Sequence, residues 1–172
     1  MAVPAIIARV AAGYSGYRRD RAKEDDALVR EALSRELSKS REHLVSIVSH
    51  FQRPGNRVEE LGTRAAKKAI DELEIFMQEA KLGVVGRSYK FPSRRKSAKV
   101  KDIRRLVAFD EAMVDAAVNI SQTAQTLEDK VLAGDEVDLG METERLRQYT
   151  TACRNRFKDR IDVIKKIGRE AK

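Results

Sequence analysis

The chain contains one cysteine, three prolines and no tryptophan, and aromatic residues make up only 5% of its 172 positions. A lone cysteine, Cys153, excludes a disulfide within the chain and indicates a reducing compartment. No apolar run approaches the roughly 20 residues that a membrane-spanning helix needs. The apolar opening of the chain is interrupted by Arg9 and has no basic start, so we expect no cleaved signal peptide. These absences together predict a cytoplasmic protein.

The composition favours long helices. Charged residues make up 36% of the chain, and alanine, leucine, glutamate, lysine and arginine are abundant. Apolar residues recur at three- and four-residue intervals along four stretches, which is the spacing of one helix face. Short connections within each pair of stretches predict two helical hairpins. We expect an all-α fold, an elongated antiparallel up-down-up-down four-helix bundle that forms one domain over residues 20–172.

Turn and capping residues mark the ends of these helices. A Pro-Gly pair within residues 53–56 breaks the chain, and Asn56 with Glu59 forms a capping box that begins the second helix. Gly83 and Gly134 stand where glycine commonly ends a helix. The third helix is therefore expected to begin near residue 98, and the fourth to run from about residue 138 towards 168.

The same spacing predicts which side chains face the core. For the four helices in order they are Leu33, Leu37, Leu44, Val48 and Phe51; Val58, Leu61, Ala65, Ala69, Leu73, Phe76 and Ala80; Ile103, Leu106, Met113, Ala117, Ile120, Ala124, Leu127 and Val131; and Leu146, Tyr149, Cys153, Phe157, Ile161 and Ile164. Asp110 interrupts the third series. We expect it to fix the register by pairing with an arginine of a neighbouring helix, or to reach the bundle edge. A switch or a ligand contact is the functional alternative.

Residues 1–19 form a separate N-terminal amphipathic segment. If residues 4–18 are helical, one face carries Val3, Ile6, Ile7, Val10, Tyr14 and Tyr17. This face either docks on the bundle or on a second copy of the chain, or it lies in a membrane interface through Ile6, Ile7 and Val10.

Positive charge is concentrated in residues 81–105. This stretch holds ten lysine and arginine residues and one acid, Asp102, so it carries +9 in a chain of net charge +8. The rest of the chain is therefore close to −1. The charge centres on the predicted basic loop of residues 83–98, which is longer than the roughly 2–8 residues usual between bundle helices. Such a patch attracts a polyanion: nucleic acid, an anionic membrane or an acidic protein.

Ten residues of this region form the candidate polyanion site. Basic side chains are expected to contact phosphates, and two aromatic side chains are expected to stack on bases. The residues are Arg87, Lys90, Arg94, Arg95, Lys96, Lys99, Lys101 and Arg105, with Tyr89 and Phe91 as the aromatic pair. The alternative is a solvated loop whose charge only keeps the protein soluble.

No pattern in the sequence points to catalysis, a metal or a cofactor. His43 and His50 lie seven residues apart without further ligands, and no phosphate-binding loop or nucleophile–base pair is present. The leading hypothesis is a non-catalytic helical bundle that binds nucleic acid or a ribonucleoprotein through the basic loop. A peripheral membrane or scaffold protein that docks through the N-terminal helix, and a homo-oligomeric interaction module, are the alternatives.

Overall fold

The computed structural model describes residues 5–17, 21–53, 60–82 and 100–170; residues 168–170 are described through their backbone only. Within these ranges the protein is all-helical. The helices are α1 (Ala5–Val10), α2 (Ala22–Phe51), α3 (Glu60–Leu82), α4 (Val100–Ala133) and α5 (Leu139–Glu170). The prediction of an all-α fold is therefore confirmed for the described part of the chain.

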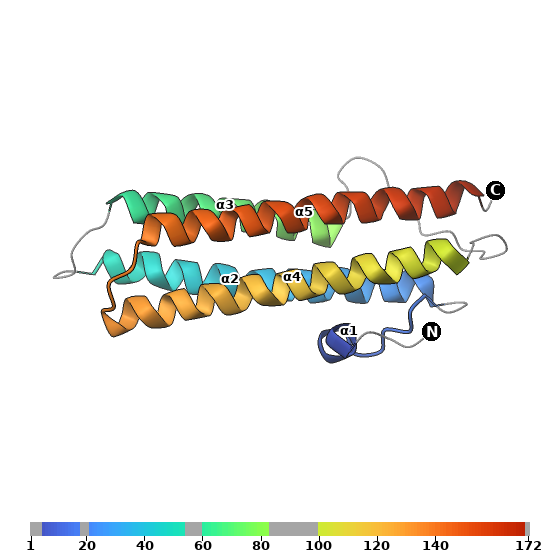
Figure 1. The fold of residues 1–172 in the computed structure, drawn as a ribbon, viewed down its shortest axis with the longest axis horizontal. Coiled ribbons are helices and arrows are strands. Elements are labelled where there is room, and N and C mark those ends of the chain that lie inside the picture. Colours follow the sequence, from blue (N-terminus) through green and yellow to red (C-terminus); the bar gives the residue numbers. More distant parts are fainter. Residues whose placement is uncertain (1–4, 18–20, 54–59, 83–99, 171–172) are drawn as a thin grey trace.

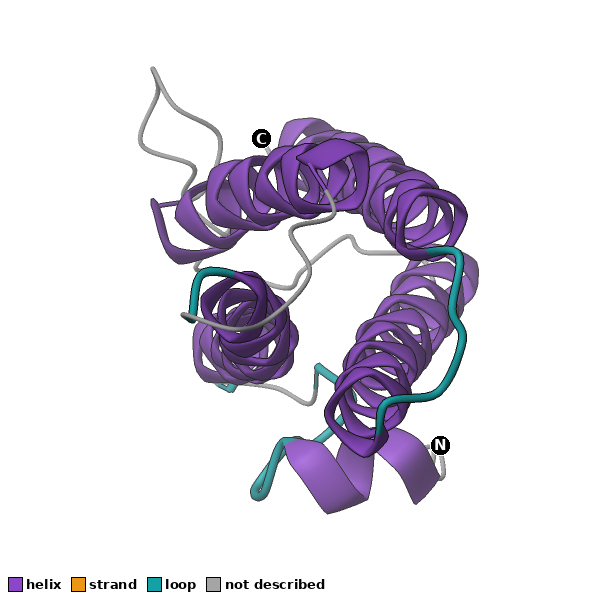
Figure 2. Cartoon of the chain, turned by 90° about the vertical axis from the view of Figure 1, so that its left-hand side faces the viewer, coloured by secondary structure: helices purple, strands orange, loops and turns teal. Residues whose placement is uncertain are grey.

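The four long helices lie side by side along the long axis of the molecule (Figure 1). α2 packs against α3 and α4, and α5 packs against the same two helices. Viewed along the axis, the long helices surround a common centre, and the short α1 lies outside them against α4 (Figure 2). α3 and α4, which follow each other in the chain, therefore lie diagonally across the bundle and are not one of its four main pairs of contacting helices.

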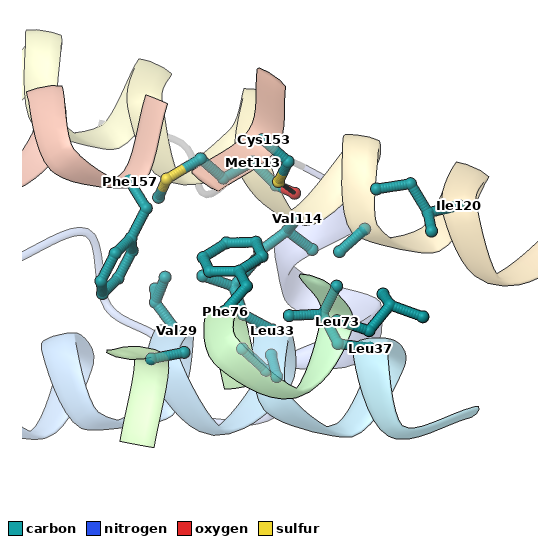
Figure 3. Close-up of a cluster of buried hydrophobic side chains, with 14 of the residues drawn as sticks. Val29, Leu33, Leu37, Leu73, Phe76, Met113, Val114, Ile120, Cys153 and Phe157 are labelled. Carbon is teal, nitrogen blue, oxygen red and sulfur yellow. Dashed lines mark hydrogen bonds between the residues drawn. The ribbon is translucent and has the colours of Figure 1, made fainter. Parts of the chain in front are cut away.

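The core is built from the faces that the apolar spacing predicts. All eight residues expected on the inner face of α4 are buried, and Phe76 of α3 meets Phe157 of α5 with ring centroids 5.7 Å apart. Figure 3 shows these rings among Leu33, Leu73 and other side chains from all four long helices. This interior fixes the positions of the charged groups described below.

Two residues expected in the core are exposed. Leu61 is 78% exposed because its neighbour Gly62 faces α5 instead, where an added Cβ would lie 2.8 Å from the Leu139 Cβ. Tyr149 is 43% exposed, with its hydroxyl accepting a hydrogen bond from Arg145. Phe51 and Ala65 are half-buried. Val58 lies outside the described residues.

The N-terminal helix is shorter than predicted. α1 ends at Val10, whose carbonyl accepts a hydrogen bond from Arg35, and the chain then turns through residues with positive φ: Gly13, Gly16 and Tyr17. The condition that residues 4–18 form one helix does not hold within the described residues, because the two glycines adopt a left-handed conformation that a helix does not allow. The expected apolar face is nevertheless covered, since Ile7, Tyr14 and Tyr17 are buried.

Gly134 ends α4 as predicted. Its φ is +79°, its N–H donates to the Val131 carbonyl, and the Asp135 N–H donates to the Lys130 carbonyl. These two bonds form the Schellman motif of a glycine-capped helix. α5 continues to Glu170, slightly beyond its expected end. The predicted capping box at Asn56 and the predicted cap at Gly83 lie outside the described residues.

Candidate functional site

The structure describes two of the ten candidate polyanion-binding residues. Lys101 and Arg105 are exposed on the first turns of α4. The other eight lie outside the described residues; they are Arg87, Tyr89, Lys90, Phe91, Arg94, Arg95, Lys96 and Lys99.

Further exposed cations lie near the start of α4. Arg104 follows on the next turn, and the Arg105 guanidinium stands 5.6 Å from the ring centre of Phe109. Lys166 of α5 lies 3.8 Å from the Asp102 carboxylate. Within the described ranges no ion pair engages Lys101, Arg104 or Arg105. These three charges are therefore exposed and unpaired by any acid of the described ranges.

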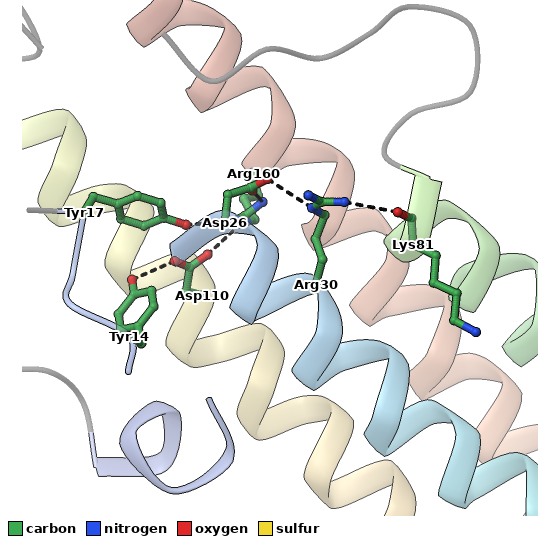
Figure 4. Close-up of polar contacts among 7 residues, drawn as sticks. All are labelled: Tyr14, Tyr17, Asp26, Arg30, Lys81, Asp110 and Arg160. Atoms are coloured by element: carbon green, nitrogen blue, oxygen red, sulfur yellow. Dashed lines mark hydrogen bonds and ion pairs between the residues drawn. The ribbon is translucent and has the colours of Figure 1, made fainter. Parts of the chain in front are cut away.

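A buried cluster of charged and polar side chains lies one to two turns deeper in the same half of the bundle, around Arg160 (Figure 4). The Arg160 guanidinium is fully buried. It donates from Nε to Asp110 at 2.6 Å, from one terminal nitrogen to Asp26 at 2.7 Å, and from the other to the Tyr17 hydroxyl at 2.6 Å. Tyr14 donates its hydroxyl to the second oxygen of Asp110 at 2.8 Å. One arginine of α5 thus joins α2, α4 and the N-terminal segment.

The expected arginine partner of Asp110 is therefore confirmed, and it is Arg160. Burial raises the pKa of the Asp110 carboxyl, while the Arg160 charge and the two tyrosine hydroxyls oppose that shift. Burial also raises the pKa of Tyr14 and Tyr17, so both phenols stay neutral and keep their hydroxyl protons. A buried charge without partners is costly, so each group of the cluster depends on the others.

Asp25 ties the N-terminal segment to the start of α2. Its carboxylate accepts hydrogen bonds from the Ser15 N–H and hydroxyl, both at 2.7 Å, and from the Tyr17 N–H at 2.6 Å. These bonds hold the left-handed turn at Gly16 and place the Tyr17 hydroxyl within hydrogen-bonding distance of Arg160. The N-terminal segment is therefore fixed by polar contacts as well as by burial of Ile7.

Arg30 extends the cluster to the end of α3. Its Nε donates to Asp26 at 3.0 Å, and a terminal nitrogen donates to the Lys81 carbonyl at 3.1 Å. An arginine that bonds a carbonyl in the last turn of a helix satisfies an acceptor the helix itself leaves open. Lys81 is also the first residue of the basic region, so α3 is held in place close to where that region begins.

α3 and α5 are joined by a second, partly exposed set of ion pairs. Arg154 donates to Glu79 at 2.7 Å and to Glu72 at 3.2 Å. The hydrogen bond from Arg154 lowers the pKa of the Glu79 carboxyl despite some burial. These ion pairs neutralise the charges of Arg154, Glu72 and Glu79 within the fold.

The described residues contain no group of three or more histidine, cysteine, aspartate or glutamate side chains placed to hold a metal ion. Burial raises the pKa of the Cys153 thiol to about 12, so the thiol is protonated near neutral pH. His43 pairs with Glu128 of α4 at 2.6 Å. None of the described helices is both long and apolar enough to cross a bilayer.

The sequence analysis missed Arg160, although a weak signal was present. Arg160 follows Phe157 by three residues and precedes Ile164 by four, so it lies on the same helix face as these two residues. Its neighbour Ile161 continues the apolar series of α5, so Arg160 leaves no gap of the kind that Asp110 leaves in α4. Asp26 and Tyr17 carry no such signal. Comparison with protein-family models, with curated proteins and with solved structures finds no match to this chain.

Proposed function

We propose that this protein is a non-catalytic helical bundle that binds nucleic acid through the basic region of residues 81–105. The observation that carries the proposal is the charge distribution: ten basic residues and one acid fall in 25 consecutive positions of a chain that is otherwise nearly neutral. A patch of this kind binds phosphates by releasing the counterions that surround them.

The described ends of this region support the proposal. Lys101, Arg104 and Arg105 are exposed on α4, and no acid of the described residues pairs with them. The Arg160 cluster and the Arg30 bond to α3 hold the helices on both sides of the region in fixed positions. In this proposal the bundle supplies a rigid base, and residues 83–99 supply most of the phosphate contacts. Tyr89 and Phe91 stack on exposed bases.

We also propose that the long helices alternate in direction, as an up-down-up-down bundle. His43 pairs with Glu128 while Arg160 joins Asp26 to Asp110, so α2 and α4 advance together along the axis. Near the start of both helices Gly62 of α3 faces Leu139 of α5, and further along Phe76 meets Phe157, so α3 and α5 run in the same direction. This arrangement brings the chain back to the same end of the bundle after α3. With its lone buried cysteine, the protein is proposed to act in the cytoplasm.

The test measures the binding of labelled oligonucleotides to nuclease-treated protein by fluorescence anisotropy at several salt concentrations. A variant with Arg94, Arg95, Lys96 and Lys99 changed to alanine is expected to lose most of the affinity and to show a shallower salt dependence. Its helical circular dichroism is expected to match that of the wild type.

A matched control removes four positive charges from the other half of the bundle. Arg53 follows the end of α2, and Arg64, Lys67 and Lys68 lie on α3; all four are exposed. Changing these four to alanine lowers the net charge equally and is expected to leave most of the affinity in place. Equal loss in both variants would show that only net charge matters and would contradict a site in residues 81–105.

Absence of binding by the wild type at low salt would favour the membrane hypothesis. That hypothesis requires α1 to leave its place against α4, because Ile7 is fully buried while Ile6 and Val10 are only half-buried. Association with anionic liposomes that is lost when residues 1–17 are deleted would then support it. Light scattering of the same samples tests the homo-oligomer hypothesis.

A further inference from the structure

A groove runs between α4 and α5 in the half of the bundle away from the Arg160 cluster. Its volume is about 1000 Å³, and its floor is apolar, formed by Ile120, Leu127 and Cys153. Uncharged polar side chains border it on α4; they are Asn119, Gln122, Thr123 and Thr126. The α4 residues that line it span 14 steps from Ala116 to Lys130, or about 21 Å at about 1.5 Å per residue.

Three cations line this groove. Lys130 comes from α4, and Arg145 and Arg156 come from α5; all three are exposed. Among the described residues no acid forms an ion pair with Lys130 or Arg156. Four acids also belong to the lining, so the groove has no net positive charge, and its cations act as individual contact points for phosphates beside the hydrogen-bonding groups of α4.

Tyr149 presents an aromatic ring in the middle of the groove lining. The ring is 43% exposed, which is unusual in this chain because most of its described aromatic side chains are buried or half-buried. Arg145 holds it in place, donating to the hydroxyl at 2.8 Å with its guanidinium carbon 5.6 Å from the ring centre. A fixed, exposed ring between cations is the arrangement on which single-stranded bases stack.

The groove faces the same way as part of the basic end. Arg105, Phe109, Ala112, Ala116, Asn119 and Thr123 follow one another along α4 at alternating four- and three-residue steps, so they share one helix face. A strand bound at the start of α4 can thus continue along this face into the groove.

Acidic residues mark the other end of the groove. Asp135, Glu136 and Asp138 lie in the connection from α4 to α5, and Glu142 lies in the first turn of α5. Their charges repel phosphates, so a bound strand ends beside Lys130 and Arg145. This limits the groove to a short segment.

We infer that the α4–α5 groove binds a short single-stranded segment of nucleic acid, with a base stacked on Tyr149 and phosphates held by Arg156, Arg145 and Lys130. A duplex does not fit this role, because its bases are stacked inside and offer no face to Tyr149. The inference rests on the proposed function, since it names the form of nucleic acid that the bundle takes.

The test compares Tyr149→Leu, Tyr149→Phe and Arg156→Gln in the full-length protein, with labelled 12-nucleotide single-stranded RNA and DNA and with the matching duplexes. Tyr149→Leu is expected to weaken single-strand binding about 5- to 150-fold, the loss usual for one stacked base, and to leave duplex binding unchanged. Tyr149→Phe retains the ring and is expected to retain most of the affinity. Arg156→Gln is expected to reduce the salt slope by about 0.7, the value for one phosphate of a single strand.

Failure of this inference is distinguishable from failure of the proposed function. If the Arg94–Lys99 variant loses binding but Tyr149→Leu and Arg156→Gln bind as tightly as the wild type, the groove is not a binding site and the proposed function stands. If the wild type binds no oligonucleotide at low salt, both are overturned. Equal loss of single-strand and duplex binding in Tyr149→Leu would also contradict a stacked base.

Discussion

The charges around Arg160 and those at the start of α4 lie in the same half of the bundle but differ in how the fold treats them. Arg160 is fully buried and its guanidinium is shared among Asp26, Asp110 and Tyr17. Lys101 and Arg105 are exposed, and no described acid pairs with them. Buried charges of the first kind fix which helices meet and at what register. Charges of the second kind, exposed at the surface, contribute little to folding.

Breaking the buried cluster is expected to have the largest effect on stability. Arg160→Met leaves the Asp26 and Asp110 carboxylates without their common cation and is expected to cost about 3–5 kcal/mol of unfolding free energy. Urea denaturation followed by circular dichroism measures this loss. Arg156→Met, one turn earlier on α5 and exposed, is the matched control and is expected to stay within about 0.5 kcal/mol of the wild type. A loss below about 1 kcal/mol for Arg160→Met would contradict the structural role of the cluster.

Releasing the N-terminal segment from the cluster is expected to have the next largest effect. Asp25→Ala removes the acceptor of the Ser15 and Tyr17 N–H groups, and unpaired buried donors cost about 1–3 kcal/mol. Hydrogen exchange is expected to accelerate at these two amides before it does so in α4. Glu24→Ala changes an exposed neighbour that does not contact the segment and serves as the control. Unchanged protection of the Tyr17 amide would show that burial alone holds the segment.

The sequence predicts the helix faces well because each face depends only on local spacing. Most of the inner residues of α4, its glycine cap at Gly134 and an arginine partner for Asp110 follow from that spacing. The exposed basic residues Lys101 and Arg105 follow from charge alone. Spacing does not reveal which helices are neighbours, since α2 meets α4 only through contacts about 85 residues apart along the chain, such as His43 to Glu128.

The parts of the candidate sites that were not predicted depend on such distant contacts. Arg160 and Asp26 are 134 residues apart, and no local rule joins them. The Val10 carbonyl at the end of α1 accepts a hydrogen bond from Arg35, and the turn at Gly16 is held by the bonds of Asp25 to Ser15 and Tyr17. Tyr149 lies at the edge of the predicted inner face of α5, where a small rotation of the helix decides whether a side chain enters the core or lines the groove.

The ion pairs of Arg154 are partly exposed, between the buried charges around Arg160 and the exposed charges at the start of α4. They are expected to have a moderate, pH-dependent effect on stability. Arg154→Gln is expected to lower the unfolding free energy by about 1 kcal/mol at neutral pH. Because Arg154 lowers the folded-state pKa of Glu79, the unfolded chain binds the proton first on acidification. The stabilisation is complete above the ordinary glutamate pKa and is lost as the pH falls through the lowered one. The difference between Arg154→Gln and wild type is therefore expected to shrink from pH 7 to pH 3 in urea titrations, and a constant difference would contradict the ion pair.

The exposed charges are expected to have the smallest effect on stability and a clear effect on binding. Changing Lys101, Arg104 and Arg105 together to glutamine removes no described ion pair, so the unfolding free energy is expected to stay within about 0.5 kcal/mol of the wild type. If each side chain contacts one phosphate, the logarithmic salt slope of oligonucleotide binding falls by about 0.7–0.9 per residue, or about 2–3 for the three. Parallel urea and anisotropy titrations separate the two quantities. A stability loss above about 1 kcal/mol would place these residues with Arg160 as structural charges, because a side chain that the fold needs for its own packing is not free to hold a ligand.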